Sequence, residues 1–350
     1  MVDPALALIV AFIVAALLAL IFWPRRGLYA RWERVRQLTD RVRREDALKR
    51  LLLSEEEGQR CSADTVAGAL EMGRNEAALL LQAMQADDLV QMVGGELKLT
   101  PAGRESAIHI VRAHRLWEHH LAQETGFDAT EWHARAEDRE HNLAPAELES
   151  LAARLGNPTH DPHGDPIPSA SGLFGSQRGL PLTQLPADSS ATIIHIEDEP
   201  EIVFAQLAAA GLTSGETIKV VAADSAEMTI WAGGEQHTLP IAAANNVTVR
   251  LLTASQVAAA SEGIRSLTTL TLHETGVVAG LSPRCRGVER RRFLDLGILP
   301  GTKITAELQS PSGDPTAYRI RGALIALRYD QAALIELRAA EEIAATALAA

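Results

Sequence analysis

The sequence contains few cysteines and few aromatic residues, and it lacks an excess of positive charge. Only Cys61 and Cys285 occur among 350 residues, which excludes a disulfide scaffold or a cysteine-rich zinc module and fits a reducing compartment. The formal net charge is −12, so the chain as a whole is not a generic nucleic-acid binder. It contains no phosphate loop, nucleophile elbow or paired-base arrangement, so we expect that the protein is not an enzyme.

One long hydrophobic run is present, at the N-terminus. Residues 5–22 are 18 consecutive apolar residues without a charge, enough to cover most of a hydrocarbon core of ~30 Å as a helix. A cleavable signal peptide is the alternative, but such peptides begin with basic residues, whereas only Asp3 is charged here. The run therefore predicts a transmembrane helix over residues 4–23.

The segment after this run is basic. Residues 25–44 contain eight arginines against Glu33 and Asp40, and eight minus two gives +6. The positive-inside rule then places the N-terminus outside and the later domains in the cytoplasm, as in a single-pass protein of the inner membrane. A helix over 24–44 could hold its arginines against anionic lipid or against DNA, and the sequence leaves both uses open.

Residues 45–104 have the element order of a winged helix-turn-helix. Ser62 is placed to cap a helix, and Gly73 ends that helical pattern before a second apolar-periodic run. Two short alternating segments around Gly94 and Gly95 follow and indicate a β-hairpin. The order of helix, helix, turn, helix and hairpin is typical of this DNA-binding fold.

Residues 105–157 carry imidazoles and carboxylates at helical spacing. The side chains are His114 and Glu118, then His133, Glu137, Glu140 and His141. Offsets of four, seven and eight place such residues on one helix face, so two facing helices would form a cage of donors. This chemistry suits manganese, iron or zinc better than calcium, although a solvated helix face is the alternative. His119 and His120 point away from the His114 face and are predicted to be solvated.

After residue 157 the pattern changes. Residues 158–183 are rich in Gly, Pro, Ser and Asp and are interpreted as a linker, in which His163 is a local hydrogen-bonding residue. Residues 184–253 and 264–338 contain short strands with glycine turns and share the internal repeat L-x(2–3)-G-[IL]-x-x-G-x-x-I. They predict two small SH3-like β-barrels, before a tail at 339–350. A basic patch at 284–292 is interpreted as a solvated face or as a docking surface for an acidic partner.

The fold class predicted is therefore α+β multidomain: a transmembrane helix, a winged helix-turn-helix, a helical metal and dimerisation domain, and two SH3-like barrels. Over residues 42–253, the motifs LTPAGRESA, AHRLWEHHL, HARAEDREH and DPHGDPIP resemble the diphtheria-toxin-repressor and manganese-transport-regulator family. Those proteins are metal-dependent transcriptional repressors that act as homodimers. The final segment is similar to FeoA proteins, which accompany ferrous-iron transporters.

The resemblance implies two ligand sets. One consists of Asp46, Glu137, Glu140 and His141, and the other of His114, Glu118 and His133. In some relatives an acidic residue of the third domain joins the second set, and Glu199 and Glu201 lie near the matching place. A donor set without thiolate favours Fe(II) or Mn(II) as the cofactor.

The recognition helix departs from the family pattern. Arg74, Asn75 and Gln82 are the candidates for DNA contacts, but Glu76 and the leucines at 79–81 are unsuited to reading base edges. Residues 40–105 hold nine basic and thirteen acidic residues, a net charge of −4, which disfavours phosphate binding. We therefore keep two hypotheses: a membrane-anchored metal-dependent regulator of operator DNA, or a metal-sensing accessory subunit of a ferrous-iron transporter that does not bind DNA.

Overall fold

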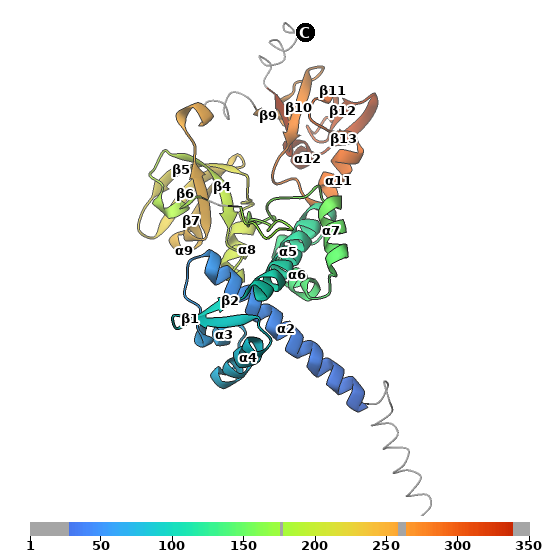
Figure 1. Ribbon diagram of the computed structural model, residues 1–350. Helices are drawn as coiled ribbons and strands as arrows, with labels where there is room; N and C mark the ends of the chain where they lie inside the picture. Colours follow the sequence, from blue (N-terminus) through green and yellow to red (C-terminus); the bar gives the residue numbers. More distant parts are fainter. Residues whose placement is uncertain (1–27, 176–177, 258–263, 339–350) are drawn as a thin grey trace, which may run out of the picture. The chain divides into compact units, whose positions relative to one another are not determined.

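The computed structural model describes residues 28–175, 178–257 and 264–338 (Figure 1). The chain divides into two compact units at Val111 and Arg112. Among the described residues, none of the helices has both the length and the apolar character needed to cross a membrane. This finding overturns the predicted membrane localisation. The apolar run at 5–22 lies outside the described residues.

The first unit has the element order of a winged helix. Its elements are α2 (Leu28–Glu56), α3 (Ala63–Ala69), α4 (Arg74–Ala86), β1 (Val90–Val93) and β2 (Glu96–Leu99). Ser62 caps α3, because its hydroxyl accepts a hydrogen bond from the backbone N–H of Thr65 at 3.2 Å. Gly94 and Gly95 both have positive φ and connect the antiparallel strands β1 and β2. Such a turn matches the twist of a hairpin and needs residues that tolerate this conformation.

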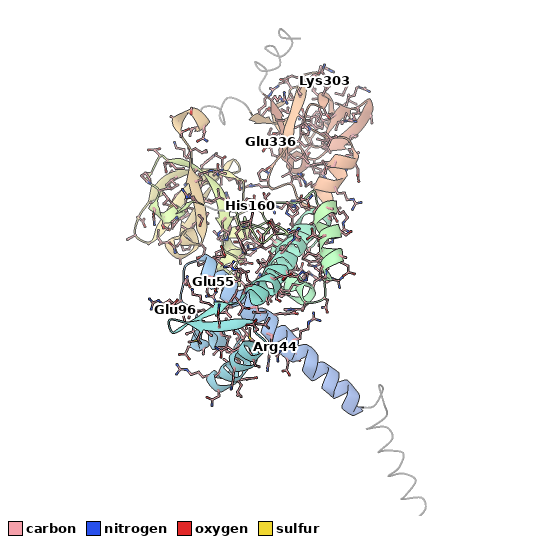
Figure 2. All side chains as sticks on the ribbon, viewed as in Figure 1. Arg44, Glu55, Glu96, His160, Lys303 and Glu336 are labelled. Atoms are coloured by element: carbon pink, nitrogen blue, oxygen red, sulfur yellow. The ribbon has the colours of Figure 1, made fainter. Side chains whose placement is uncertain are left out.

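A small apolar core holds the winged helix together. Leu51 and Leu52 of α2, Val66 of α3 and Met84 of α4 are all fully buried. Ion pairs surround this core: Arg44, labelled in Figure 2, contacts Asp87 at 2.6 Å. Exposed pairs of this kind contribute little to stability, so apolar burial accounts for most of it.

The second unit starts within α5 (Pro101–Glu124) and continues with η1 (Ala129–Glu131), α6 (Trp132–Glu140) and α7 (Pro145–Arg154). A shared apolar cluster packs α5 against α7: Ala113, Leu116, Leu143, Leu148, Leu151, Ala152 and Ile167. Ile167 belongs to the range predicted as a linker. The helical layer therefore includes part of that range in its core.

Residues 161–168 form a fixed loop rather than a loose spacer. Asp161 and His163 are buried, and one oxygen of the Asp161 carboxylate accepts the backbone N–H groups of His163, Gly164 and Asp165, each at 2.9 Å. Arg115 of α5 donates to the carbonyl of Pro166 at 2.6 Å. These bonds satisfy the buried backbone of a loop that has no regular structure.

Two small barrels complete the second unit. The first contains β3 (Leu180–Pro181), η2 (Leu182–Gln184), β4 (Ser190–Ile196), α8 (Glu201–Ala209), β5 (Thr217–Ala223), β6 (Glu227–Ala232), β7 (Glu235–Pro240), α9 (Ile241–Asn245) and β8 (Val247–Leu251). The second contains β9 (Ile264–Ser266), η3 (Leu267–Thr269), β10 (Thr275–Leu281), α11 (Gly287–Asp295), β11 (Lys303–Gln309), β12 (Thr316–Ile320), β13 (Ala323–Leu327), α12 (Tyr329–Ala333) and β14 (Ile335–Arg338). Their sheet orders, β3-β8-β4-β5-β6-β7 and β13-β12-β11-β10-β14-β9, correspond strand for strand when one of them is reversed.

The repeated helix and turn explain the repeated sequence pattern. Helices α8 and α11 are followed by Gly211 and Gly297, with φ of 69° and 76°. The N–H of the next residue, Leu212 or Ile298, returns to a carbonyl of the helix at 3.1 or 2.9 Å. Glycine at this position permits the left-handed conformation that ends the helix. The loop before each helix, 197–200 in the first barrel and 282–286 in the second, differs strongly in charge.

Candidate metal centre

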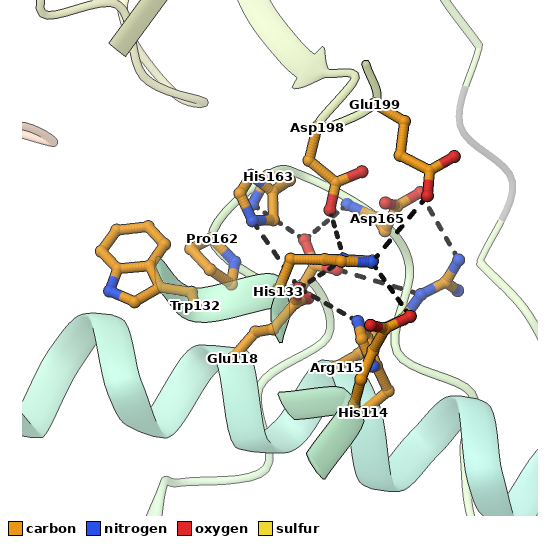
Figure 3. Close-up of polar contacts among 12 residues, drawn as sticks. His114, Arg115, Glu118, Trp132, His133, Pro162, His163, Asp165, Asp198 and Glu199 are labelled. Carbon is orange, nitrogen blue, oxygen red and sulfur yellow. Dashed lines mark hydrogen bonds and ion pairs between the residues drawn. The ribbon is translucent and has the colours of Figure 1, made fainter. Parts of the chain in front are cut away.

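Three of the predicted ligands meet between α5 and α6 (Figure 3). His114 and Glu118 lie one turn apart on α5, and His114 Nε2 is 3.0 Å from Glu118 Oε1. The same oxygen is 3.4 Å from Nδ1 of His133 on α6. The rings of His114 and His133 meet edge to face, 4.9 Å apart between their centres. The helical spacing thus places these three donors around one point.

Two further residues reach this point from outside the helices. Asp198, in the loop after β4, places Oδ2 2.8 Å from His133 Nδ1. His163, in the fixed loop, places Nε2 3.8 Å from Glu118 Oε1, and this buried nitrogen has no hydrogen-bond partner among the described residues. Glu199 approaches His133 only to 4.0 Å. Asp198 is therefore the acidic side chain nearest His133 from the barrel, one residue before the predicted Glu199.

The two outer donors are held in place by the surrounding fold. The His163 ring packs edge to face on Phe204, with ring centres 5.0 Å apart. The carbonyl of His163 accepts the N–H of Ile196, the last residue of β4, at 2.9 Å. Because Asp198 follows two residues later, the loop and the barrel position both donors together.

The electrostatics of the centre favour ionised carboxylates. Burial alone would raise the pKa of Glu118, but the charge and hydrogen bond of His114, with help from His133, hold it well below its usual range. Burial also opposes ionisation of Asp198, and the hydrogen bond from His133 outweighs this and lowers its pKa. Burial disfavours a charged His133, yet its contacts with Asp198, Glu118 and Glu137 raise its pKa to about 12.

This donor set fits a divalent transition metal. Donor atoms of His114, Glu118 and His133 lie within 4.8 Å of one another, and so do those of Glu118, His163 and Asp198. Buried imidazole and carboxylate without thiolate match Mn(II), Fe(II) or Zn(II). An unpaired buried nitrogen costs on the order of 1–3 kcal/mol unless something binds it, and a metal ion would supply that partner for His163.

The other predicted ligand set is divided between the units. Glu140 and His141 lie at the end of α6, with 3.6 Å between Glu140 Oε1 and His141 Nε2, whereas Asp46 lies on α2 of the first unit. Glu137 is 3.4 Å from His133 Nε2 and is exposed. Oε2 of Glu140 also hydrogen-bonds Nδ1 of His114. Glu140 therefore touches both sets, and the set with Asp46 stays a prediction.

A hydrogen bond to Nδ1 has a chemical consequence for His114. A carboxylate at one ring nitrogen fixes the tautomer and orients the other nitrogen toward a metal. Glu140 would thus fix the proton of His114 at Nδ1 and direct Nε2 at the point shared with Glu118. Two other histidines of α5 have partners of their own: His120 pairs with Glu124 at 2.8 Å, and His119 contacts the carbonyl of His160 at 3.2 Å.

The candidates for DNA contact lie on one helix of the first unit. Arg74, Asn75 and Gln82 are all exposed on α4. Leu79 is exposed on the same helix, at 66% of its surface. Glu76, expected to repel phosphate, is paired with Arg43 of α2 at 2.6 Å. Both partners of that pair are already counted in the net charge of −4 over residues 40–105, so the pair leaves that charge unchanged.

Comparison with known proteins assigns the family. A family model described as the iron dependent repressor, metal binding and dimerisation domain matches residues 100–169, and the FeoA domain model matches residues 180–251 and again 265–339. The iron-dependent repressor IdeR of Mycobacterium bovis is 30% identical over 210 residues, which cover 56% of this chain and 91% of that protein. The chain therefore belongs to the family of iron-dependent transcriptional repressors.

Two further relatives agree with this assignment. The diphtheria toxin repressor of Corynebacterium diphtheriae is 29% identical over 181 residues, covering 49% of this chain and 80% of that protein. Among solved structures, a manganese-dependent transcriptional repressor in complex with manganese aligns with a TM-score of 0.54 and 27% identity. That alignment covers 59% of this chain and 99% of the other. Helical domain and SH3-like sheets are thus both parts of a metal-dependent repressor fold, with a second FeoA domain added.

Proposed function

We propose that the protein is a metal-dependent transcriptional regulator whose effector is Fe(II) or Mn(II). The observation that carries this proposal is the buried cluster of Glu118 with His114, His133 and His163, closed by Asp198. Within this cluster, the buried Nε2 of His163 has no hydrogen-bond partner in the part of the chain that the structure describes. The relatives named for iron and manganese support these two ions.

We propose that the second ligand set links the winged helix to the helical metal domain. Asp46 belongs to the helix that also carries the core of the winged helix, and Glu140 and His141 belong to α6. A metal held by both would favour one orientation of the winged helix, which makes the ion an effector through its differential affinity for that arrangement. Glu137 is the fourth ligand of this set in the family pattern.

DNA binding is the test of the regulator. Metal is expected to raise operator affinity by about 1–3 kcal/mol, the usual coupling between linked sites. The assay is fluorescence anisotropy of labelled upstream DNA with the chain, with and without Mn(II). Arg74→Ala and Asn75→Ala should weaken binding, and affinity should fall steeply with salt. Gln85→Ala, at another exposed position of α4, is the matched control.

We also propose that the regulator is a two-fold homodimer. An open cavity of about 480 Å³ lies over the helical domain, lined by apolar Trp117, Leu143, Ala146 and Leu151, by polar Ser150 and by charged Arg139, Glu147 and Arg154. The matched family model names dimerisation for this domain, so a second copy is the occupant that we assign. Sedimentation of the chain in metal tests this, and a monomer at micromolar concentration contradicts it.

Two observations support a second candidate function, that of an accessory subunit in ferrous-iron transport. Two FeoA matches in tandem, together with the exposed Leu79 on α4, suit an accessory subunit of a ferrous-iron transporter. In that case no DNA is retained at low salt with saturating metal. Co-purification with the transporter, lost on deletion of residues 264–338, supports this function instead of the regulator.

A further inference from the structure

The loop before α11 in the second barrel packs against residues next to the metal ligands. Nη2 of Arg286 donates to the carbonyl of Pro162 at 3.4 Å, and Nε donates to the carbonyl of Pro283 at 3.1 Å. The guanidinium carbon lies 5.7 Å from the ring centre of Trp132. Pro162 directly precedes His163, and Trp132 directly precedes the ligand of α6. One side chain therefore contacts the neighbours of two metal-binding candidates.

Contacts on either side of Arg286 fix this loop in place. Arg284 pairs with the buried Glu216 of the first barrel at 2.9 Å, and its guanidinium lies so close to Gly233 that an added Cβ would be 2.0 Å away. Gly287, with φ of 57°, lies against the carbonyl of Thr125, which an added Cβ would approach to 2.3 Å. The loop thus touches the barrel and the helix that supply the other donors.

This placement differs from the surface patch predicted for 284–292. A run of arginines is usually solvated, but Arg284 and Arg286 are only partly exposed and each contacts a group outside the second barrel. Arg291 and Arg292, by contrast, are exposed on α11. Both arginines belong to a turn, in which the N–H of Cys285 donates to the carbonyl of Ser282 at 2.8 Å.

We propose that Arg286 is a positioning residue of the metal centre, through which the second barrel holds His133 and His163 in ligand geometry. The inference rests on the proposed metal site. Removal of a group that orients a metal ligand without touching the metal typically lowers metal affinity about tenfold to a hundredfold. The direct charge effect has the opposite sign, because a buried cation repels a metal ion. Removal of Arg286 therefore weakens binding if it positions ligands and strengthens binding if its charge dominates.

The experiment is a Mn(II) titration of the full chain, with free Mn(II) followed by electron paramagnetic resonance. A His141→Ala background weakens the second ligand set, so that the titration reports mainly on the centre beside Arg286. Arg286→Ala and Arg286→Gln are expected to bind about tenfold to a hundredfold more weakly and to change the zero-field splitting of the bound ion. Arg286→Lys should recover part of the affinity, because it keeps one donor for the Pro162 carbonyl.

Arg291→Ala is the matched control, since it removes an arginine of the same barrel that is exposed. Thermal unfolding of the metal-free variants measures folding separately from metal binding. If Arg286→Ala does not fold, Arg286→Gln takes its place, because glutamine retains most of the side-chain volume. Unchanged or tighter binding by the Arg286 variants overturns the inference, and so does an equal loss in Arg291→Ala. If the parent chain binds no Mn(II), the proposed metal site fails and the inference with it.

Discussion

Metal binding at the centre around Glu118 is expected to release at least the proton of His133 throughout the neutral pH range. Burial opposes a charged His133, but its contacts with Asp198, Glu118 and Glu137 outweigh this and raise its pKa to about 12. The metal-free protein therefore carries an imidazolium at neutral pH. A metal ion can occupy a ring nitrogen only after the proton has left, so protons and metal compete and affinity rises with pH.

The expected magnitude follows from one displaced proton. Each pH unit changes the apparent affinity tenfold, or by about 1.4 kcal/mol, so the change between about pH 6 and pH 8 is roughly a hundredfold. A histidine with the usual pKa of about 6.5 is already neutral at pH 7 and gives almost no change above it. The interval from about pH 7 to pH 8 thus separates the two cases.

The assay measures the Mn(II) dissociation constant across this interval, in the His141→Ala background, and counts protons by calorimetry in two buffers of different ionisation enthalpy. His133→Asn is the matched variant, and it should bind more weakly and release about one proton fewer. An affinity that stays constant between about pH 7 and pH 8, or a count of zero protons in the parent chain, refutes the reasoning.

Three further outcomes are expected. Glu140→Gln should weaken Mn(II) binding about tenfold or more, because the Glu140 carboxylate orients the ring of His114. His119→Ala should change Mn(II) binding little, and titrations of both variants test this difference. Gly164→Ala should lower the melting temperature and the metal affinity together, since φ is 104° and the added Cβ would lie 2.0 Å from the carbonyl of Ile194. Phe293→Ala, at a fully buried position, should cost about 3–5 kcal/mol in denaturant unfolding, and a loss below ~1 kcal/mol would contradict that core.

Local patterns made much of the helical part predictable. The four-residue spacing of His114 and Glu118 is a property of one helix, so the sequence alone defines their common face. The cap at Ser62 and the turn at Gly94 and Gly95 are local in the same sense. The end of a helix places strong limits on backbone conformation, so the same glycine follows the short helix in both barrels. This repeated glycine made the internal repeat, and with it the two barrels, visible in the sequence.

Contacts between distant segments were not predictable in this way. Asp198 and His163 lie in loops, where side chains follow no period, and their distance to α5 depends on how the first barrel packs on the helices. The only signals were an acidic run at 197–201 and a histidine in a proline-rich segment. The interpretation of 284–292 as a surface patch failed at Arg284 and Arg286 for a related reason. The density of charge along a sequence does not reveal which side chains turn inward.

The duplicated barrel has an evolutionary consequence. The same connection, between the first long strand and the helix, carries Asp198 among acidic neighbours in one copy and Arg284 and Arg286 in the other. The two copies carry opposite charges at this connection, so neither loop could take the other's place in the proposed metal centre. A recombination event that made the repeats alike again would remove either a carboxylate donor or the arginine contacts. Natural selection should therefore keep these two loops divergent while the strands around them remain free to stay similar.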